Sequence, residues 1–221
     1  MIAVRIRFFI AVLILVGCAS GKDNSDPWLI LADGKQGSIN VHTRRQDLVQ
    51  AYGAKNVVDG DIGIGEGEVE SGTVLFPHDP ERSIEILWND TENKADPSSL
   101  TIRGDKSRWK AHDVSLGTTL KQLERLNGKS FHMSGYGWDY SGTVLSWDKG
   151  TLAHDLGEFD PQGAEPGRVI LRLECGAVRL TQDEELQVAG DHDFSSDHPV
   201  LQKLNPCVSE MVWVFPQKRK N

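Results

Sequence analysis

The chain has 221 residues, with 24 lysines and arginines against 32 aspartates and glutamates, and a formal net charge of −8 at pH 7. A chain of this length can bury a sizeable core without disulfide bonds to compensate for small size. Its one basic cluster, Lys218-Arg219-Lys220, lies at the extreme end. Because binding to phosphates requires a basic face, nucleic acid is not an expected partner.

The first eighteen residues have the pattern of an export signal. Two arginines precede an apolar run from Phe8 to Val16, and small Gly17 stands before Cys18. Nine apolar residues are too few for a membrane-spanning helix, which needs about 20. The pattern resembles the signal of bacterial lipoproteins, which implies removal of residues 1–17 and acylation, as with palmitate, of Cys18. An ordinary secretory signal with a chance cysteine is the alternative.

The resemblance to lipoproteins also implies a location. Residues 18–27 comprise the lipidated cysteine and a polar, flexible tether. Ala19 and Ser20 follow the cysteine, and no aspartate stands there to signal retention at the inner membrane. We therefore expect attachment of the protein through its lipid anchor to the outer membrane of the bacterial cell envelope, facing the periplasm.

Two cysteines remain once Cys18 carries lipid. Outside the cytoplasm thiols tend to pair, so a disulfide between Cys175 and Cys207 is predicted. Two buried free thiols are the alternative.

The folded part is expected to begin at Trp28 and to have an α+β fold, with a mainly antiparallel sheet and two short helices. Thr43, with Gln46 three residues later, predicts a first helix that ends at Gly53. Residues 59–70 alternate glycine, acids and aliphatics, and Ser71-Gly72 is expected to turn the chain into residues 73–76, which predicts a hairpin. Ile62 and Ile64 are expected to face inward, and Val69 to do so after a register shift at Gly65 or Gly67.

A second helix is predicted to begin after Thr118 or Thr119 and to end at Gly128. The pattern divides the folded part into an N-terminal α+β half, residues 28–110, and a C-terminal α+β half, residues 111–216, followed by a basic tail, 217–221. The similarity of the two halves has two possible interpretations: an internal duplication, or two short helices that lie between strands by coincidence.

Gly117 to Gly128, and more loosely His42 to Gly53, share a feature of known tandem-repeat proteins. Each segment leads through threonine into a helix with an internal leucine and a terminal glycine. This arrangement resembles the outer-membrane assembly lipoproteins of the SmpA/OmlA type and the β-lactamase-inhibitory protein, although the proline that usually follows the terminal glycine is missing here. The resemblance implies a binding role.

Aromatic residues beside glycines form the candidate binding site. Tyr136, Trp138 and Tyr140 could stack on a sugar ring or on a partner's side chain, and Asp139 could hold a hydroxyl group. Packing of the same aromatics in the core is the alternative.

An acidic loop with two histidines is the weak candidate for a metal site. Its possible ligands are Asp191, His192, Asp193, Asp197 and His198, but their spacing matches no established zinc pattern. A solvated loop is the alternative. The sequence contains no serine-hydrolase elbow and no glycine-rich nucleotide motif, so no catalytic residue is assigned and no cofactor or nucleotide is expected.

The first functional hypothesis is a non-enzymatic, lipid-anchored interaction module that binds an envelope protein or a cell-wall component. A periplasm-facing metal-dependent hydrolase that uses the loop from Asp191 to His198 is the alternative enzyme. An inhibitor of a cell-wall hydrolase is the third hypothesis, because many such enzymes are basic and this chain is acidic.

Overall fold

Eleven strands in three antiparallel sheets and five α-helices make up the part of the chain that the structure, a computed structural model, describes: residues 28–30, 39–158, 167–176 and 178–216. The expected α+β fold with a mainly antiparallel sheet is confirmed. The helices are α1 (Arg45–Tyr52), the 3₁₀-helix η1 (Ala54–Asn56), α2 (Leu120–Asn127), α3 (Thr151–Asp155), α4 (Gln182–Gln187) and α5 (Pro199–Leu204). The strands are β1 (Val57–Gly65), β2 (Glu68–Leu75), β3 (Ile84–Asp90), β4 (Ala95–Arg103), β5 (Lys110–Ala111), β6 (Val114–Ser115), β7 (His132–Ser134), β8 (Val144–Ser146), β9 (Arg168–Cys175), β10 (Asp193–Ser195) and β11 (Cys207–Val214).

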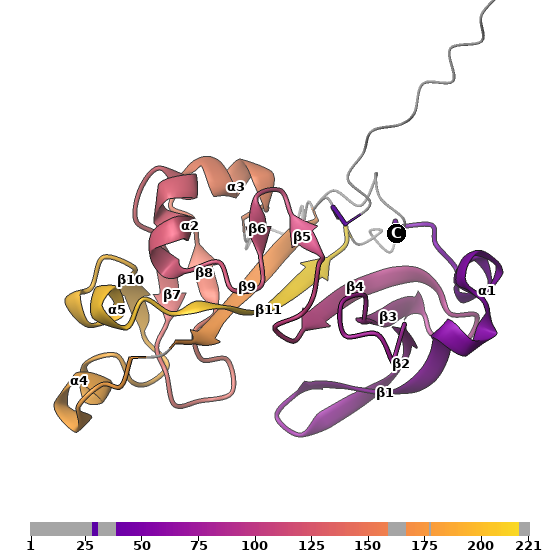
Figure 1. The fold of residues 1–221 in the computed structure, drawn as a ribbon, viewed down its shortest axis with the longest axis horizontal. Helices are drawn as coiled ribbons and strands as arrows, with labels where there is room; N and C mark the ends of the chain where they lie inside the picture. Colours follow the sequence, from indigo (N-terminus) through magenta and orange to yellow (C-terminus); the bar gives the residue numbers. More distant parts are fainter. Residues whose placement is uncertain (1–27, 31–38, 159–166, 177, 217–221) are drawn as a thin grey trace, which may run out of the picture.

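A six-stranded sheet in the order β1-β2-β3-β4-β11-β9 runs through the molecule (Figure 1). The first four strands are consecutive in the chain, whereas β11 comes from its end and pairs with β4 from Glu210 opposite Arg103 to Val214 opposite Ser99. Strands from both expected halves therefore build one sheet. The second half also contributes the small sheet β10-β7-β8, beside which α2, α3 and α5 lie in Figure 1.

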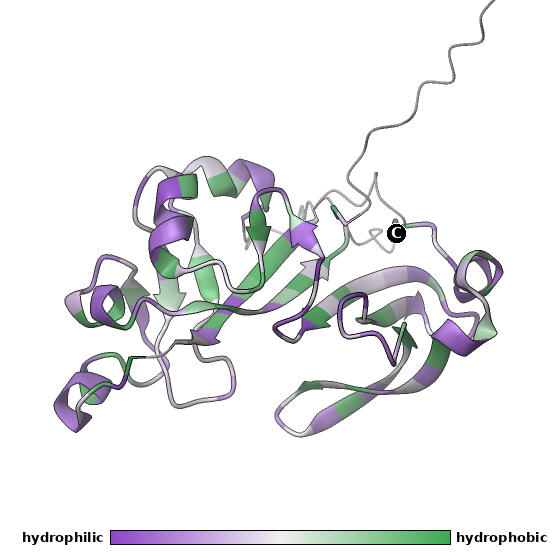
Figure 2. Ribbon diagram, viewed as in Figure 1, coloured by the Kyte–Doolittle hydropathy of each residue, from purple (hydrophilic) through white to green (hydrophobic). Residues whose placement is uncertain are grey.

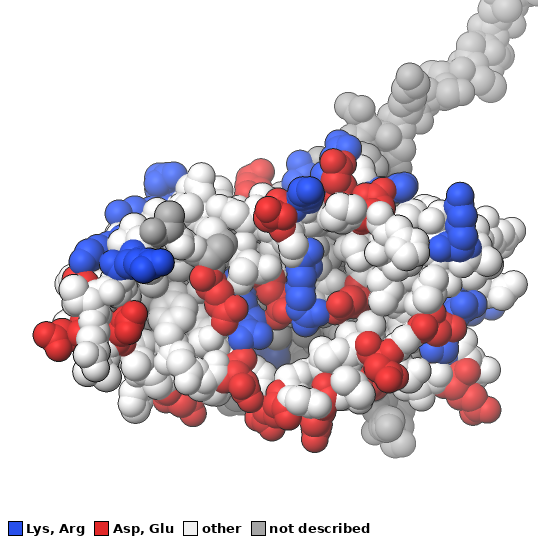
Figure 3. Space-filling view, turned by 60° about the horizontal axis from the view of Figure 1, so that its bottom comes forward, with Lys and Arg blue, Asp and Glu red and all other residues white. Residues whose placement is uncertain are grey.

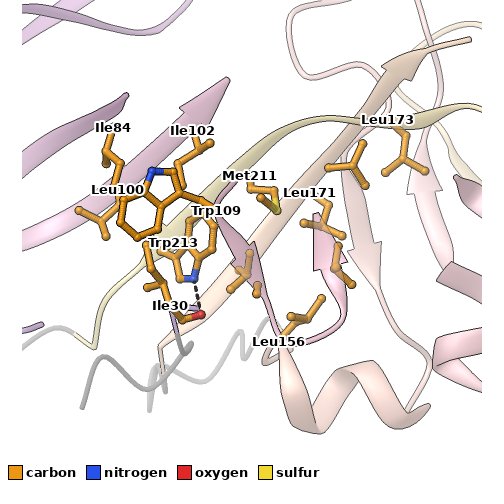
Figure 4. Close-up of a cluster of buried hydrophobic side chains, with 14 of the residues drawn as sticks. Ile30, Ile84, Leu100, Ile102, Trp109, Leu156, Leu171, Leu173, Met211 and Trp213 are labelled. Carbon is orange, nitrogen blue, oxygen red and sulfur yellow. Dashed lines mark hydrogen bonds between the residues drawn. The ribbon is translucent and has the colours of Figure 1, made fainter. Parts of the chain in front are cut away.

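One hydrophobic cluster joins strands and helices from the whole described chain (Figures 2 and 4). Strand β11 shows why: Met211 and Trp213 are fully buried, while the alternating Glu210 and Val212 point to the opposite face. The indole Nε1–H of Trp213 donates to the carbonyl oxygen of Ile30 at 3.1 Å. The core thus fastens the beginning of the folded part to a strand near its end.

Both eight-residue helices begin in the same way. Thr43 and Thr118 each accept a hydrogen bond from the backbone N–H three residues earlier and close a turn. The next residue in each case is the N-cap. Thr119 forms a capping box with Gln122, whereas at α1 the N-cap is Arg44 and not the predicted Thr43, and the Arg44 backbone N–H donates to Asp47 Oδ2 at 3.0 Å.

Strands β1 and β2 form a hairpin over residues 57–75, but its turn lies at Glu66-Gly67 and not at the predicted Ser71-Gly72, which falls inside β2. The inward face of the hairpin also differs from the prediction. Ile62 is buried, whereas Ile64 is 42% exposed and Val69 is 62% exposed. The pairing shifts register between Gly63 and Gly65, which leaves Ile64 without a strand partner. The tip, Glu66-Gly67, has positive φ at both residues, as a type I′ turn requires.

The acidic segment from Asp191 to His198, which was expected to be a loop, contains the short strand β10. Strand β10 forms because Phe194 pairs with Met133 of β7. No pattern in the neighbouring sequence predicts this contact.

Asp59 at the start of β1 makes folding sensitive to acid. Its Oδ1 accepts from Arg45 Nε and from the Thr73 hydroxyl, each at 2.8 Å, and lies 3.5 Å from Lys94 Nζ. Burial alone would raise the pKa of Asp59, but the hydrogen bonds from Arg45 and Thr73 and the charges of Lys94 and Arg45 outweigh it and lower the pKa below 3.8.

A carboxyl group with a lowered pKa in the folded state stabilises the protein above its ordinary pKa, and this stabilisation is lost as the pH falls through the folded pKa. The free energy of unfolding of the wild type should therefore drop when the pH is lowered from about 5 to about 3, and the drop should be smaller in Asp59→Asn. Urea titrations at several pH values measure this, with Asp61→Asn on the same strand as control. An equal drop in Asp59→Asn and in the wild type would contradict the assignment.

Candidate functional site

The face of the six-stranded sheet opposite the core carries charged side chains. We call the surface formed by Glu85 of β3, Arg103 of β4, Glu210 of β11, and Arg172 and Glu174 of β9 the open face. Each of these residues alternates with buried aliphatic or aromatic neighbours on its strand, so strand periodicity alone places them on the side away from the core.

The open face is held together by ion pairs. Arg103 contacts both Glu85 and Glu210, and Arg172 Nη1 lies 3.8 Å from Glu210 Oε1. Burial would lower the pKa of Arg103, but the charges of Glu210 and Glu85 outweigh it and raise the pKa. Glu210, whose side chain is only 13% exposed, is therefore the anion between two guanidinium groups.

Replacing Glu210 by glutamine is expected to lower the free energy of unfolding by about 1–3 kcal/mol, because both arginines lose their shared anion in a partly buried place. Glu81→Gln is the matched control. Glu81 pairs with Arg108 at 3.7 Å on a well-exposed surface, where ion pairs contribute little. Urea unfolding measures both variants, and equal values for the two would show that the network does not stabilise the fold.

The aromatic loop, residues 135–142, borders the open face and contains the four residues that were predicted to bind. Tyr136 is half-buried, donates its hydroxyl to the carbonyl of Leu173 at 2.8 Å, and has a raised pKa because of burial and the charge of Glu174. Trp138 is also half-buried and stacks edge-on against Tyr140, with ring centroids 5.4 Å apart. Asp139 and Tyr140 are exposed. Tyr136 is therefore a packing residue, and the accessible aromatic surface comes from Trp138 and Tyr140.

The loop is tied to β9 by side-chain hydrogen bonds. Arg172 Nη2 donates to the carbonyl of Asp139, and the Ser141 hydroxyl donates to Glu174 Oε1 at 2.7 Å. At the hairpin, a Cβ added to Gly65 would lie 3.3 Å from the Tyr140 hydroxyl. The tip of the β1–β2 hairpin therefore meets the aromatic loop beside the open face.

Exposed apolar residues gather around this junction. Ile64 and Val69 near the hairpin tip and Tyr140 of the loop are among the large hydrophobic residues that stay exposed in the described chain. The hairpin also contains five acidic residues and no lysine or arginine. Figure 3 views the molecule from the hairpin side and shows acidic groups along its lower edge and basic groups near the middle. The surface combines apolar contact area with negative charge, which suits a binding surface for a basic partner.

The five weak metal candidates do not converge. His198 caps α5 by accepting from the N–H of Val200, and Asp193 Oδ1 lies 2.7 Å from His132 Nδ1. The ring of His192 stacks edge-on against Phe194. Within the described part of the chain, no three His, Cys, Asp or Glu side chains are grouped so as to hold a metal ion, and Asp191 and Asp197 join no such group.

The backbone places the two predicted disulfide partners opposite each other. Cys207 of β11 is the Cα partner of Cys175 of β9. In antiparallel pairs the Cα atoms lie about 4.5–5.5 Å apart, within the range that disulfides span. The bond itself stays a prediction. Cys18 and the basic tail, residues 217–221, lie outside the described residues.

Sequence reasoning missed the residues of the open face. Glu85, Arg103 and Glu210 interrupt aliphatic strands at alternate positions, and this alternation was a signal that three strands had a common charged face. Nothing local indicated that Arg103 and Glu210, which are 107 positions apart, would pair.

Comparison of the chain with protein-family models, with curated proteins and with solved structures finds no match.

Proposed function

We propose that the chain is a lipid-anchored protein of the bacterial envelope, attached to the outer membrane through Cys18, which acts as a non-enzymatic binding module. The anchor is supported by the lipoprotein-like signal, and no described helix has the length and apolar character needed to cross a membrane. The binding role is supported by one observation above all: the tip of the hairpin, where Ile64 and Val69 are exposed, meets the exposed Tyr140 beside the open face.

Affinity capture from native envelopes tests the binding role. The lipidated full chain should retain a partner protein or a cell-wall fragment, and Tyr140→Asp should lose it. Leu186→Asp is the matched control, because Leu186 is 69% exposed and lies on α4, outside the proposed surface. Equal capture by both variants and the wild type would refute the assignment of this surface.

The anchor has its own test. Mass spectrometry of the mature protein should find acyl chains on Cys18 at its amino end, and Cys18→Ser should leave the membrane fraction. A mature chain that starts elsewhere and carries no acyl mass would refute the anchored location.

A second function, inhibition of a basic cell-wall hydrolase, is favoured by the acidic hairpin, where Asp61, Glu66, Glu68 and Glu70 make no ion pair with any described residue. Addition of the protein should then slow a lysozyme-type enzyme at low ionic strength and have little effect in about 1 M salt, where charges are screened within about 3 Å. Undiminished enzyme activity at low salt would eliminate this candidate.

A further inference from the structure

Strand β1 forms one end of the six-stranded sheet, and among the described residues it pairs only with β2. Its beginning is covered, because Arg45 donates to Asp59 Oδ1 at 2.8 Å and to the carbonyl of Val57 at 3.4 Å. From Gly60 to Ile64 the backbone N–H and C=O groups of the outer edge have no strand beside them in the described part. Such an edge is a template for pairing with another chain.

The usual means of protecting a strand edge are scarce in β1. The strand has nine residues, without proline or lysine, and its one irregularity lies near the tip, between Gly63 and Gly65. Gly60 and Gly63 have no left-handed backbone, and a Cβ at either position would meet nothing within 4 Å. Nothing within the described structure therefore requires glycine at these two positions. Glycine would be required if the backbone of a second chain came close to the edge there.

The charges of the hairpin select the kind of strand that can pair with this edge. Asp59 is neutralised by Arg45 and Lys94, but Asp61 and the three glutamates of residues 66–70 have no cationic partner among the described residues. A second copy of β1 would bring like charges together and be repelled. A basic segment would be attracted.

The two sides of β1 differ in polarity. Side chains alternate along a strand, so Val58 and Ile62 lie on one side and Asp59 and Asp61 on the other. Val58 is 44% exposed and offers apolar contact on its side of the edge. An added strand would therefore place apolar residues beside Val58 and basic residues beside Asp61.

We propose that β1 binds an extended segment of a partner protein by strand addition, and that this segment alternates basic and apolar side chains. This inference rests on the proposed binding function and specifies the chemistry of its partner. The hydrogen bonds to the edge of β1 provide attachment, and the alternation provides specificity.

The probe is a labelled seven-residue peptide, Lys-Val-Lys-Val-Lys-Val-Lys, titrated with the full chain by fluorescence anisotropy. Two N-methylated forms are compared, one methylated on the valine amides and one on the inner lysine amides. Successive N–H groups of a strand point to opposite edges, so only one form loses the hydrogen bonds to β1. Strand addition predicts that this form binds about tenfold more weakly than the other, whereas attraction by charge alone predicts equal binding.

Charge complementarity is tested with Asp61→Lys, which should weaken binding about fivefold to tenfold, and with Asp183→Lys on α4 as control. Both residues are exposed and both substitutions change the net charge equally, so the control should stay within about twofold of the wild type. Binding of the corresponding glutamate-valine peptide as tightly as the lysine-valine peptide would overturn the proposal.

Three further results would also overturn it: equal binding of the two methylated forms, absence of binding at millimolar peptide, or binding seen only in a variant that ends at Pro216. The last result would mean that the chain's own basic tail, residues 217–221, occupies the edge of β1.

The proposed function is tested separately by envelope capture with Tyr140→Asp. A partner that is captured through Tyr140, without binding of the peptide, would refute only the strand addition.

Discussion

Replacement of Trp213 by alanine is expected to lower the free energy of unfolding by about 3–5 kcal/mol, as for other large buried aromatic residues. Trp213 is fully buried, and it lies among Ile84, Leu100, Ile102 and Met211 in the centre of the core (Figure 4). Removal of the indole leaves a cavity between β4, β11 and the first described residues. It also leaves the carbonyl of Ile30 without its hydrogen bond.

Trp213→Phe helps to separate the two contributions, because it keeps most of the packing but loses the Nε1–H and part of the ring volume. This variant should lose about 1–3 kcal/mol, mainly through smaller volume and the orphaned carbonyl of Ile30. Trp138→Ala, at the half-buried ring of the aromatic loop, is the control and should cost less than Trp213→Ala. Urea unfolding followed by circular dichroism measures all three. A loss below about 1 kcal/mol in Trp213→Ala would show that the core does not depend on this contact.

Local signals predicted the elements that depend on neighbouring residues. A hairpin followed from the alternation within residues 59–76, but its turn was expected at Ser71-Gly72 and lies at Glu66-Gly67. The start of α2 was ambiguous between Thr118 and Thr119 because either hydroxyl could cap the helix. The structure uses both: Thr118 closes the preceding turn and Thr119 caps the helix.

The prediction of the α1 N-cap was wrong for a related reason. Thr43 has the same turn-closing role as Thr118, and its buried hydroxyl accepts from the N–H of Asn40 at 2.9 Å. The cap therefore falls on Arg44, a residue type with low cap propensity, whose side chain pairs with Asp47. The same spacing that separates Thr43 from Thr118 also separates Leu48 from Leu123 and Gly53 from Gly128, so both helices have one local design.

The candidate site could be predicted only in part, because it is assembled by long-range pairing. The aromatic loop was visible as a run of aromatic residues and glycines, but its connection to Arg172 and to the hairpin depends on how β9 and β1 are placed. Ile64 and Val69 were expected inside, with a register shift at Gly65 or Gly67, but the shift lies between Gly63 and Gly65 and leaves Ile64 without a strand partner. One extra residue in a strand reverses the direction of the side chains that follow it.

Loss of the predicted disulfide is expected to lower the free energy of unfolding by about 3–4 kcal/mol, the entropy estimate for a closed loop of about thirty residues. The loop between Cys175 and Cys207 carries α4, β10 and α5. Of these elements, β10 pairs with β7 over only three residues, and α4 has no buried residue, so few native contacts hold these two elements in place. The bond would reduce the conformational freedom of this segment in the unfolded chain.

Cys175→Ser, Cys207→Ser and the double variant should each show this loss in urea unfolding under oxidising conditions, and the three losses should be equal, because either single substitution abolishes the same bond. Reductant should destabilise the wild type to a similar extent and leave the double variant unchanged. Alkylation followed by mass spectrometry gives the direct measurement: both cysteines should react only after unfolding and reduction. Labelling of both in the unfolded protein without reductant would mean two free thiols, and the stability of the segment from β9 to β11 would then depend on strand pairing alone.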